Sequence, residues 1–235
     1  MPIKPILFNK QISTEMVRAI LDGRKSCTRR ICKDANEYTV PDMEFYNADR
    51  RTYAVHNFAD KEHTEQLSIA ERTCPICPGD ILYVRETWQY LYELDGNEQV
   101  IEDTGKYYYA ATDTIPFDAY VDENGVTHDH TPWRPSIHMP KEAARIWLKV
   151  TNVRVERLQE ITENGAKAEG AIDNRGFIHS PENEYDRIHT AREHFIKIWN
   201  STIKKSDLDR YSWDVNPYVW VIEFERCEKP ETKVN

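Results

Sequence analysis

The feature of this 235-residue sequence that most constrains its fold is a near-continuous apolar run at residues 218–224, Tyr-Val-Trp-Val-Ile-Glu-Phe. A strand with apolar side chains on both faces must be covered on both faces, so the run predicts a central position in a sheet. Residues 146–155 alternate apolar and polar side chains and predict a second long strand. A β-rich run at 81–86 follows a Pro-Gly-Asp turn and predicts a third.

Three segments carry the signals of helices. Residues 13–22 place their apolar side chains on one stripe, and Gly23 then offers the positive φ at which helices commonly end. Residues 162–170 predict a short helix, and residues 185–203 a clearly amphipathic one. Because strands do not alternate regularly with helices, we expect an α+β fold with a small β-barrel or strongly bent sheet, rather than a doubly wound fold.

Two long polar stretches separate these elements. Residues 33–73 lack a sustained period of either kind, and we interpret them as a surface excursion with one short strand at 53–55. Residues 91–132 form a second excursion, in which two hairpin turn signals flank a predicted strand at 106–110.

The charge of the chain restricts its partners. With 31 basic and 40 acidic residues, the net charge is −9, which weighs against broad, salt-driven binding to a phosphate backbone. A small basic pocket within an acidic protein would suit a nucleoside or one local RNA feature. No apolar run approaches the ~20 residues of a membrane span, and the Pro-broken start does not resemble a signal peptide, so we expect a cytoplasmic protein without membrane contact.

The cysteines allow two interpretations. Their odd number and the expected location argue against a disulfide framework. The Cys-Pro-Ile-Cys spacing has the two-residue gap of half a zinc knuckle, but the flanking prolines and the four-residue gap of the first pair favour plain reduced thiols, and we expect no metal and no cofactor. The residues concerned are Cys27, Cys32, Cys74, Cys77 and Cys227.

The stretch from Gly23 to Arg30 combines basic and hydroxyl side chains directly after a helix. Lys25 and Thr28 lie three positions apart, and on a flat strand they would point to opposite faces. For both to reach one pocket, the chain must turn or bulge here. The alternative is a solvated basic turn.

The pattern Gly23-x-Lys25-x-x-Thr28-x-Arg30 resembles the signature of ASCH domains. This family has a PUA-like β-barrel associated with recognition of RNA or nucleosides. Residues 79–82, 161–169 and 218–224 resemble further family segments and occur in the family's order. The resemblance implies one PUA-like domain over residues 1–227, with flanking helices and long insertions at about 33–73 and 91–132, followed by a charged tail at 228–235.

Within that family, the candidate site residues most resemble those of the small bacterial N4-acetylcytidine amidohydrolases. The resemblance implies Thr28 as nucleophile, Lys25 as its base and Glu169, late in the short helix, as a proton carrier. An ordinary salt bridge between Lys25 and Glu169 is the alternative. The longer layout, with residues 84–88 and 133–140, looks more like larger ASCH proteins of phages and prophages.

Other side chains are candidates to contact a ligand. Arg24 and Arg30 supply positive charge beside Lys25, and Glu86 ends the strand after the Gly-Asp turn. Trp88 and Trp133 could stack on a base, although aromatic residues in a β-rich protein are more often part of the core.

Three functions follow from these residues. We expect recognition of RNA or of a modified nucleoside or base through the Lys25 and Arg30 pocket. The alternatives are an amidohydrolase that removes an acyl group from an N-acylated nucleoside, and a phage-encoded interaction protein that keeps only the fold.

Overall fold

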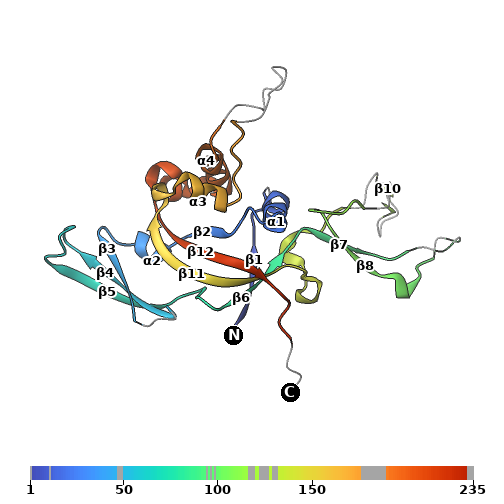
Figure 1. Ribbon diagram of the computed structural model, residues 1–235, viewed down its shortest axis with the longest axis horizontal. Coiled ribbons are helices and arrows are strands. Elements are labelled where there is room, and N and C mark those ends of the chain that lie inside the picture. The colour runs from blue at the N-terminus through green and yellow to red at the C-terminus, as the bar shows by residue number, and fades with distance from the viewer. Residues whose placement is uncertain are drawn as a thin grey trace.

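The computed structural model describes residues 2–10, 12–46, 50–93, 95, 97, 99–115, 120–121, 127–128, 132–175 and 189–231. A central sheet lies beneath a group of helices, and two β-extensions project from its opposite ends (Figure 1).

The central sheet has five strands in the order β1-β6-β11-β12-β2. β1 pairs with β6 in parallel, and the remaining pairs are antiparallel. The predicted central position of the apolar run is confirmed, since β12 is hydrogen-bonded to β11 on one side and β2 on the other. The strands are β1 (Ile3–Leu7), β2 (Cys27–Ile31), β6 (Ile81–Arg85), β11 (Trp147–Arg157) and β12 (Tyr218–Cys227).

The α+β class is confirmed, but a closed barrel is not. β1 and β2 are the two edges of the sheet, and no ladder joins them within the described residues. β11 and β12 curve strongly (Figure 1), and a register shift between Val150 and Asn152 interrupts their pairing. The edges are linked instead by a side chain, since Arg30 Nη2 donates to the Leu7 carbonyl at 2.7 Å. The sheet is therefore bent and open.

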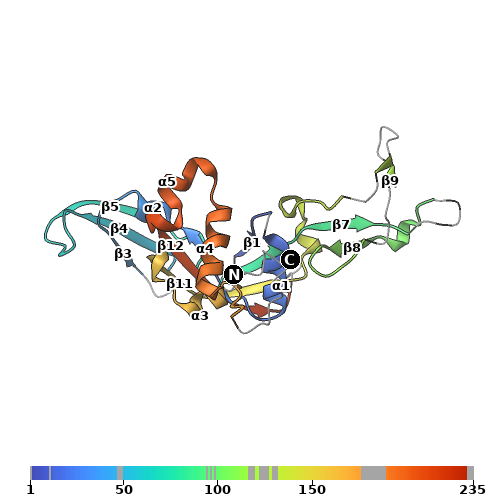
Figure 2. The same ribbon diagram turned by 90° about the horizontal axis from the view of Figure 1, so that it is seen from above.

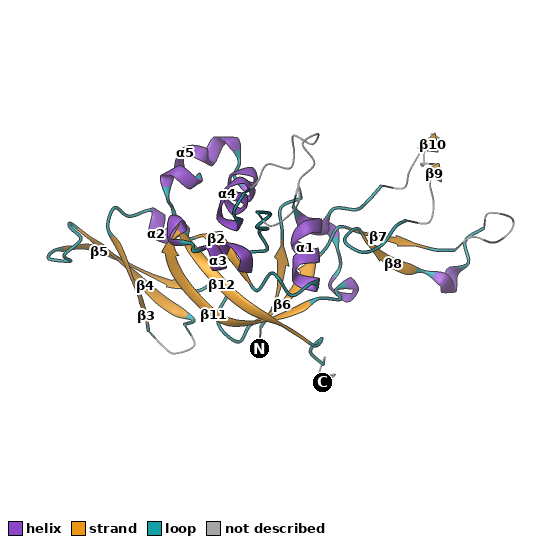
Figure 3. Ribbon diagram, turned by 45° about the horizontal axis from the view of Figure 1, so that its top comes forward, coloured by secondary structure: helices purple, strands orange, loops and turns teal. Residues whose placement is uncertain are grey.

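The helices gather on one side of the sheet, as Figure 3 shows. Gly23 ends the first helix at φ +74°, as predicted, and Thr162 caps the third by accepting from the Gly165 amide at 3.0 Å. Under the fourth, Phe195 and Trp199 pack with Val219 of β12 in a separate apolar cluster. The α-helices are α1 (Ser13–Leu21), α2 (Lys33–Asn36), α3 (Glu163–Ala168), α4 (Ala191–Thr202) and α5 (Leu208–Tyr211).

The helix predicted at residues 185–203 corresponds to α4. Its expected start at residues 185–188 lies outside the described residues, and the helix itself begins at Ala191. Thr190 accepts from the Glu193 amide while the Glu193 carboxylate accepts from the Thr190 amide, which is a capping box. Single-turn 3₁₀ segments connect several elements; they are η1 (Glu102–Thr104), η2 (Ser136–His138), η3 (Lys141–Ala143), η4 (Leu158–Glu160), η5 (Lys205–Asp207) and η6 (Trp213–Val215).

The interpretation of residues 33–73 as largely irregular is wrong. They contain α2 and an antiparallel sheet with the order β3-β4-β5. Only β4 has a run of buried side chains, whereas β5 exposes Leu67 and Ile69 and carries charged neighbours, so its sequence lacks a clear apolar period. The strands are β3 (Pro41–Phe45), β4 (Thr52–Phe58) and β5 (Gln66–Thr73).

The second excursion contains the predicted strand, while the turn signals at 95–97 and 123–125 fall partly or wholly outside the described residues. β7 (Trp88–Leu91) pairs antiparallel with β8 (Lys106–Tyr109), which confirms the strand expected near 106–110. A short pair, β9 (Tyr120–Val121) and β10 (Thr127–His128), follows. Among the described residues, no helix is long and apolar enough to cross a membrane.

Candidate functional site

The segment after Gly23 crosses between two helices before it enters the sheet. The amides of Arg24 and Lys25 both donate to the Ala19 carbonyl, at 2.9 Å each. Ser26 then donates to the Ala168 carbonyl of α3 at 2.9 Å, and Lys25 forms an isolated β-bridge with Glu169. The chain therefore turns where the spacing of Lys25 and Thr28 requires it, and this turn brings Lys25 beside α3.

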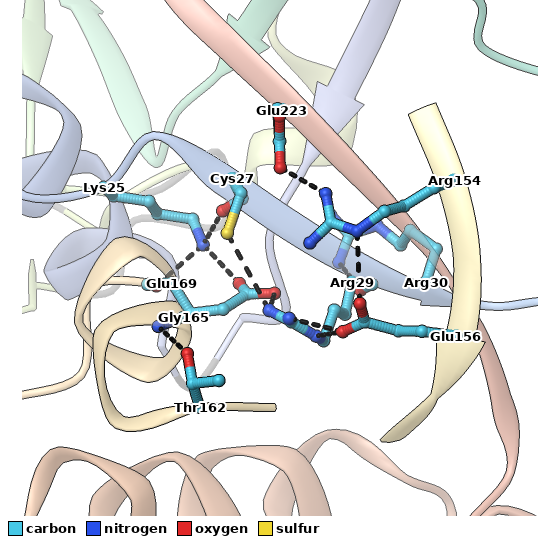
Figure 4. Close-up of polar contacts among 10 residues, drawn as sticks. All are labelled: Lys25, Cys27, Arg29, Arg30, Arg154, Glu156, Thr162, Gly165, Glu169 and Glu223. Carbon is cyan, nitrogen blue, oxygen red and sulfur yellow. Dashed lines mark hydrogen bonds and ion pairs between the residues drawn. The ribbon is translucent and has the colours of Figure 1, made fainter. Parts of the chain in front are cut away.

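The Lys25 ammonium is completely hydrogen-bonded. Its Nζ lies 2.7 Å from Glu169 Oε2, 2.7 Å from the Glu169 carbonyl and 2.8 Å from the Cys27 carbonyl (Figure 4). The Lys25 side chain is 1% exposed and that of Glu169 is 7% exposed. An ammonium has three hydrogens, so in this arrangement each has an acceptor and the nitrogen offers no lone pair.

The second carboxylate oxygen of Glu169 extends the network into the sheet. Glu169 Oε1 lies 3.3 Å from Arg29 Nη1, and Arg29 Nη2 lies 2.6 Å from Glu156 Oε1. Glu156 also pairs with Arg154, which contacts Glu223 (Figure 4). Burial alone would lower the pKa of Arg29, but its two carboxylate partners outweigh burial and raise it. The network is a chain of alternating charges across β2, β11 and β12.

A small cavity of about 50 Å³ adjoins this network. Lys25, Thr28 and Glu169 all line it, so the structure brings together the three residues that the family resemblance selects. Its other walls are largely apolar, with Phe8 on one side and Phe195 and Trp199 of α4 on another. Typical ligand pockets have volumes of about 300–1,000 Å³, so this cavity is too small for a whole nucleoside.

Thr28 is the unusual member of the cavity lining. It is 2% exposed, yet its hydroxyl has no hydrogen-bond partner in the described part of the chain. The fully buried side-chain polar atoms without a partner in the described residues lie on Ser13, His56 and Trp88, so the Thr28 hydroxyl is one that faces the cavity rather than the closed core. Thr28 is thus the polar group of this site that is available to a ligand.

Arg30 lines the same cavity from the adjacent position on the face of β2. Its guanidinium carbon lies 5.7 Å from the centre of the Phe8 ring, and Lys25 Nζ lies 5.4 Å from the same ring. Burial lowers the pKa of Arg30. Because Arg30 also donates to Leu7, it holds the open edge of the sheet at the cavity.

The remaining predicted contact residues do not line this cavity. Arg24 is exposed and pairs with Asp22 at 3.0 Å. Glu86 is buried with Arg145, whose guanidinium donates to both of its carboxylate oxygens at 3.0 and 2.8 Å. Burial raises the pKa of Glu86 despite that partner. Arg24 and Glu86 therefore do not share the cavity of Lys25.

The two tryptophans are also elsewhere. Trp88 lies in a separate core cluster with Met139 and Trp147, and its backbone bridges to Arg134. Trp133 is partly exposed in the segment before that bridge. Neither side chain lines the cavity beside Lys25.

Sequence reasoning missed the partners that make the site. Arg29 and Glu156 complete the charge network, and Phe195 and Trp199 form the wall. The sequence held one signal for Glu156. It lies two positions from Arg154, so a strand places both side chains on one face. The apolar stripe of α4 indicated burial but did not indicate which surface it would cover.

The cysteines form no disulfide, and Cys77 Sγ donates to the Cys74 carbonyl at 3.4 Å. All five are free, and four are buried. Burial raises the pKa of Cys27 to about 12, and Cys74 Sγ donates to the Ile76 carbonyl at 2.7 Å. Within the described ranges no group of three or more His, Cys, Asp or Glu residues could hold a metal ion.

Comparisons with known proteins give only distant likenesses. No family model and no curated protein matches the chain. A crystal structure from Enterococcus faecalis V583, described as family DUF984, shares 9% identity with a TM-score of 0.38, covering 97% of this chain and 76% of that one. An ASCH domain from Lactobacillus crispatus JV V101 shares 8% identity with a TM-score of 0.37, covering 96% and 79%. At these values neither likeness assigns a family, and both the ASCH and the phage resemblance stay predictions.

Proposed function

We propose that the chain recognises a base or modified nucleoside, free or within RNA, at the cavity beside Lys25. The observation that carries this proposal is the unpartnered Thr28 hydroxyl in a cavity with aromatic walls. Since Lys25 and Glu169 already satisfy one another, the hydroxyl is the group left to read a ligand.

The size of the cavity limits what enters it. A volume of about 50 Å³ admits a substituent of a few heavy atoms rather than a sugar and base. We therefore infer that an exocyclic group of the base enters, accepts or donates a hydrogen bond at Thr28, and packs against Phe195 and Trp199. An acylated amine is one such group, because it combines a carbonyl with a small apolar part.

Calorimetric titration with cytidine and N4-acetylcytidine tests this. We expect tighter binding of the acetylated nucleoside, and a loss of about five- to tenfold in affinity in Thr28→Val, the usual size of one hydrogen bond. Thr151→Val, on the exposed side of β11, makes the same chemical change away from the cavity and should bind like wild type. Equal affinities of Thr28→Val and wild type, or no binding of either nucleoside, would refute the proposal.

Amide hydrolysis is a second candidate, because Lys25, Thr28 and Glu169 line one cavity. Lys25 must first pass a proton to Glu169 along their 2.7 Å contact before its lone pair can take the Thr28 proton. Thr28 Oγ1 would then attack the acyl carbon, and the C–N bond would break as Glu169 returns its proton to the leaving amine. The acyl ester left on Thr28 would be cleaved by a water molecule, which releases the carboxylic acid while the Thr28 oxygen regains its proton from Lys25.

Incubation with N4-acetylcytidine, followed by chromatography for cytidine and acetate, separates catalysis from recognition. Product that is lost in both Thr28→Val and Lys25→Met, but retained in Thr151→Val, would support hydrolysis. Binding without product, at enzyme concentrations equal to those of the substrate, would leave recognition alone. Neither binding nor product would favour the interaction protein without catalysis.

A further inference from the structure

A second and larger pocket lies at the other end of the strands that carry the charge network. Its volume is about 250 Å³, and it is formed where α2, α5 and the start of β12 meet the end of β11. Figures 2 and 3 show α5 and α2 on the same side of that strand end. Six of its lining residues matter here: Asn36, Tyr38, Arg157, Arg210, Tyr211 and Tyr218.

The pocket is basic in an acidic protein. Arg157 and Arg210 line it, and no carboxylate does. Neither guanidinium forms an ion pair with a described residue, although Arg157 Nη1 donates to the Asn216 carbonyl at 2.9 Å. The exposed Asp209 and Asp214 of the same helical segment do not line the pocket. Two cationic groups that line one pocket without an anionic partner indicate an anionic ligand.

Three tyrosines also line the pocket. The hydroxyls of Tyr38, Tyr211 and Tyr218 have no hydrogen-bond partner in the described chain. The guanidinium carbon of Arg157 lies 3.8 Å from the centre of the Tyr218 ring, and that of Arg210 lies 5.0 Å from the Tyr211 ring. The pocket thus offers flat rings beside positive charge.

The backbone of Tyr218 is held in place before any ligand arrives. The Asn36 side-chain amide donates to the Tyr218 carbonyl at 2.8 Å and accepts from the Tyr218 amide at 2.9 Å. The Cys32 carbonyl takes the other Asn36 hydrogen at 2.8 Å. A backbone that is already ordered loses little conformational freedom on binding, which favours affinity.

We propose that this pocket binds a nucleotide unit, with the phosphate held by Arg157 and Arg210 and the planar base packed against the tyrosine rings. A guanidinium suits a phosphate because its planar fork can donate two parallel hydrogen bonds. Aromatic rings accept any base, since every base has a flat face. The proposal goes beyond the site at Thr28 and does not depend on it. The nucleotide comes from a free mononucleotide or from an RNA chain, and the two are separated by experiment.

The test compares four probes by calorimetry: cytidine 5′-monophosphate, cytidine, inorganic phosphate and a pentacytidylate RNA. We expect the monophosphate to bind at least tenfold more tightly than either cytidine or phosphate, because only it engages both parts of the pocket. Arg210→Ala should weaken this binding about tenfold. Arg226→Ala, an exposed arginine at the far end of β12, removes the same charge and should have no effect.

The RNA arm identifies the source. Pentacytidylate that binds more tightly than the monophosphate, with a slope of about −0.7 in log affinity against log salt for the one phosphate held by Arg157 and Arg210, assigns the pocket to an RNA chain. Equal or weaker binding of the RNA assigns it to a free nucleotide. The proposal is overturned if neither binds at millimolar concentration, if phosphate alone binds as tightly as the monophosphate, or if Arg210→Ala and Arg226→Ala have the same effect.

Discussion

Replacing Glu169 with glutamine tests whether the Lys25–Glu169 pair is part of the framework of the fold. Both carboxylate oxygens are engaged, one by Lys25 at 2.7 Å and the other by Arg29 at 3.3 Å. A glutamine keeps one acceptor and presents an NH₂ group to a cation. Lys25 would remain almost completely buried without its counter-charge, and breaking a buried pair in this way costs about 3–5 kcal/mol.

Urea unfolding followed by tryptophan fluorescence measures this loss. Asp22→Asn is the matched control, since it breaks the exposed pair with Arg24, which should cost no more than about 1 kcal/mol. The double variant Lys25→Met/Glu169→Leu removes both charges and should recover most of the stability lost in Glu169→Gln. If Glu169→Gln lowers the free energy of unfolding no more than Asp22→Asn does, Lys25 and Glu169 do not act as a buried ion pair and this reasoning is wrong.

Three further outcomes follow from the same structure. Thr28→Val should change the free energy of unfolding by less than about 1 kcal/mol, because its hydroxyl has no partner in the described chain to lose; a urea midpoint far below that of wild type would contradict this. In the native protein, one thiol should react rapidly with Ellman's reagent at pH 8, since only Cys227 is partly exposed, and a second fast thiol would contradict the buried positions of the others. Burial alone would raise the pKa of Asp80, but its hydrogen bonds, first that from Lys4, lower it below its ordinary value of 3.8. The stabilisation from Asp80 is therefore present above that value and lost as pH falls through the lower folded pKa, so Asp80→Asn should flatten the fall in unfolding free energy below pH 4.

The parts of the fold that could be predicted are those set by local pattern. The apolar run of β12 requires cover on both faces, and Gly23 ends α1 at a positive φ. Both signals lie within a few residues of the feature that they predict. The turn before Thr28 belongs to the same class, because the three-residue spacing of Lys25 and Thr28 is incompatible with a flat strand.

The openness of the sheet could not be predicted, because it depends on which edges meet. β1 and β2 are short and flank α1 in the sequence, and a hydrogen bond from the Arg30 side chain to the Leu7 carbonyl links them. No local pattern distinguishes such a contact from a ladder of backbone hydrogen bonds. β5 was missed for the opposite reason, since its exposed apolar residues do not form a buried face.

The proximity of Lys25, Thr28 and Glu169 could be expected only through the resemblance to a family. Glu169 is 144 positions from Lys25, and Glu156 is 127 positions from Arg29. Charged residues are frequent in this chain, so composition gives no reason to select these pairs. The cavity wall depends on how α4 docks on β2, which the amphipathic pattern of that helix leaves open.

The arginines of this chain are used in two ways, and the difference defines what each site can bind. Arg29 pairs with two carboxylates, so its charge is neutralised, and in the proposed function the adjoining cavity selects through the neutral hydroxyl of Thr28. Arg157 and Arg210 have no carboxylate in their pocket, so their charge remains available to an anion. A chain with a net charge of −9 repels an extended phosphate backbone, and a local pair of unopposed guanidiniums is the arrangement that still attracts a single nucleotide. Reversing this, by placing a carboxylate in the pocket with Tyr38→Glu, should abolish nucleotide binding there while leaving the Thr28 cavity unaffected.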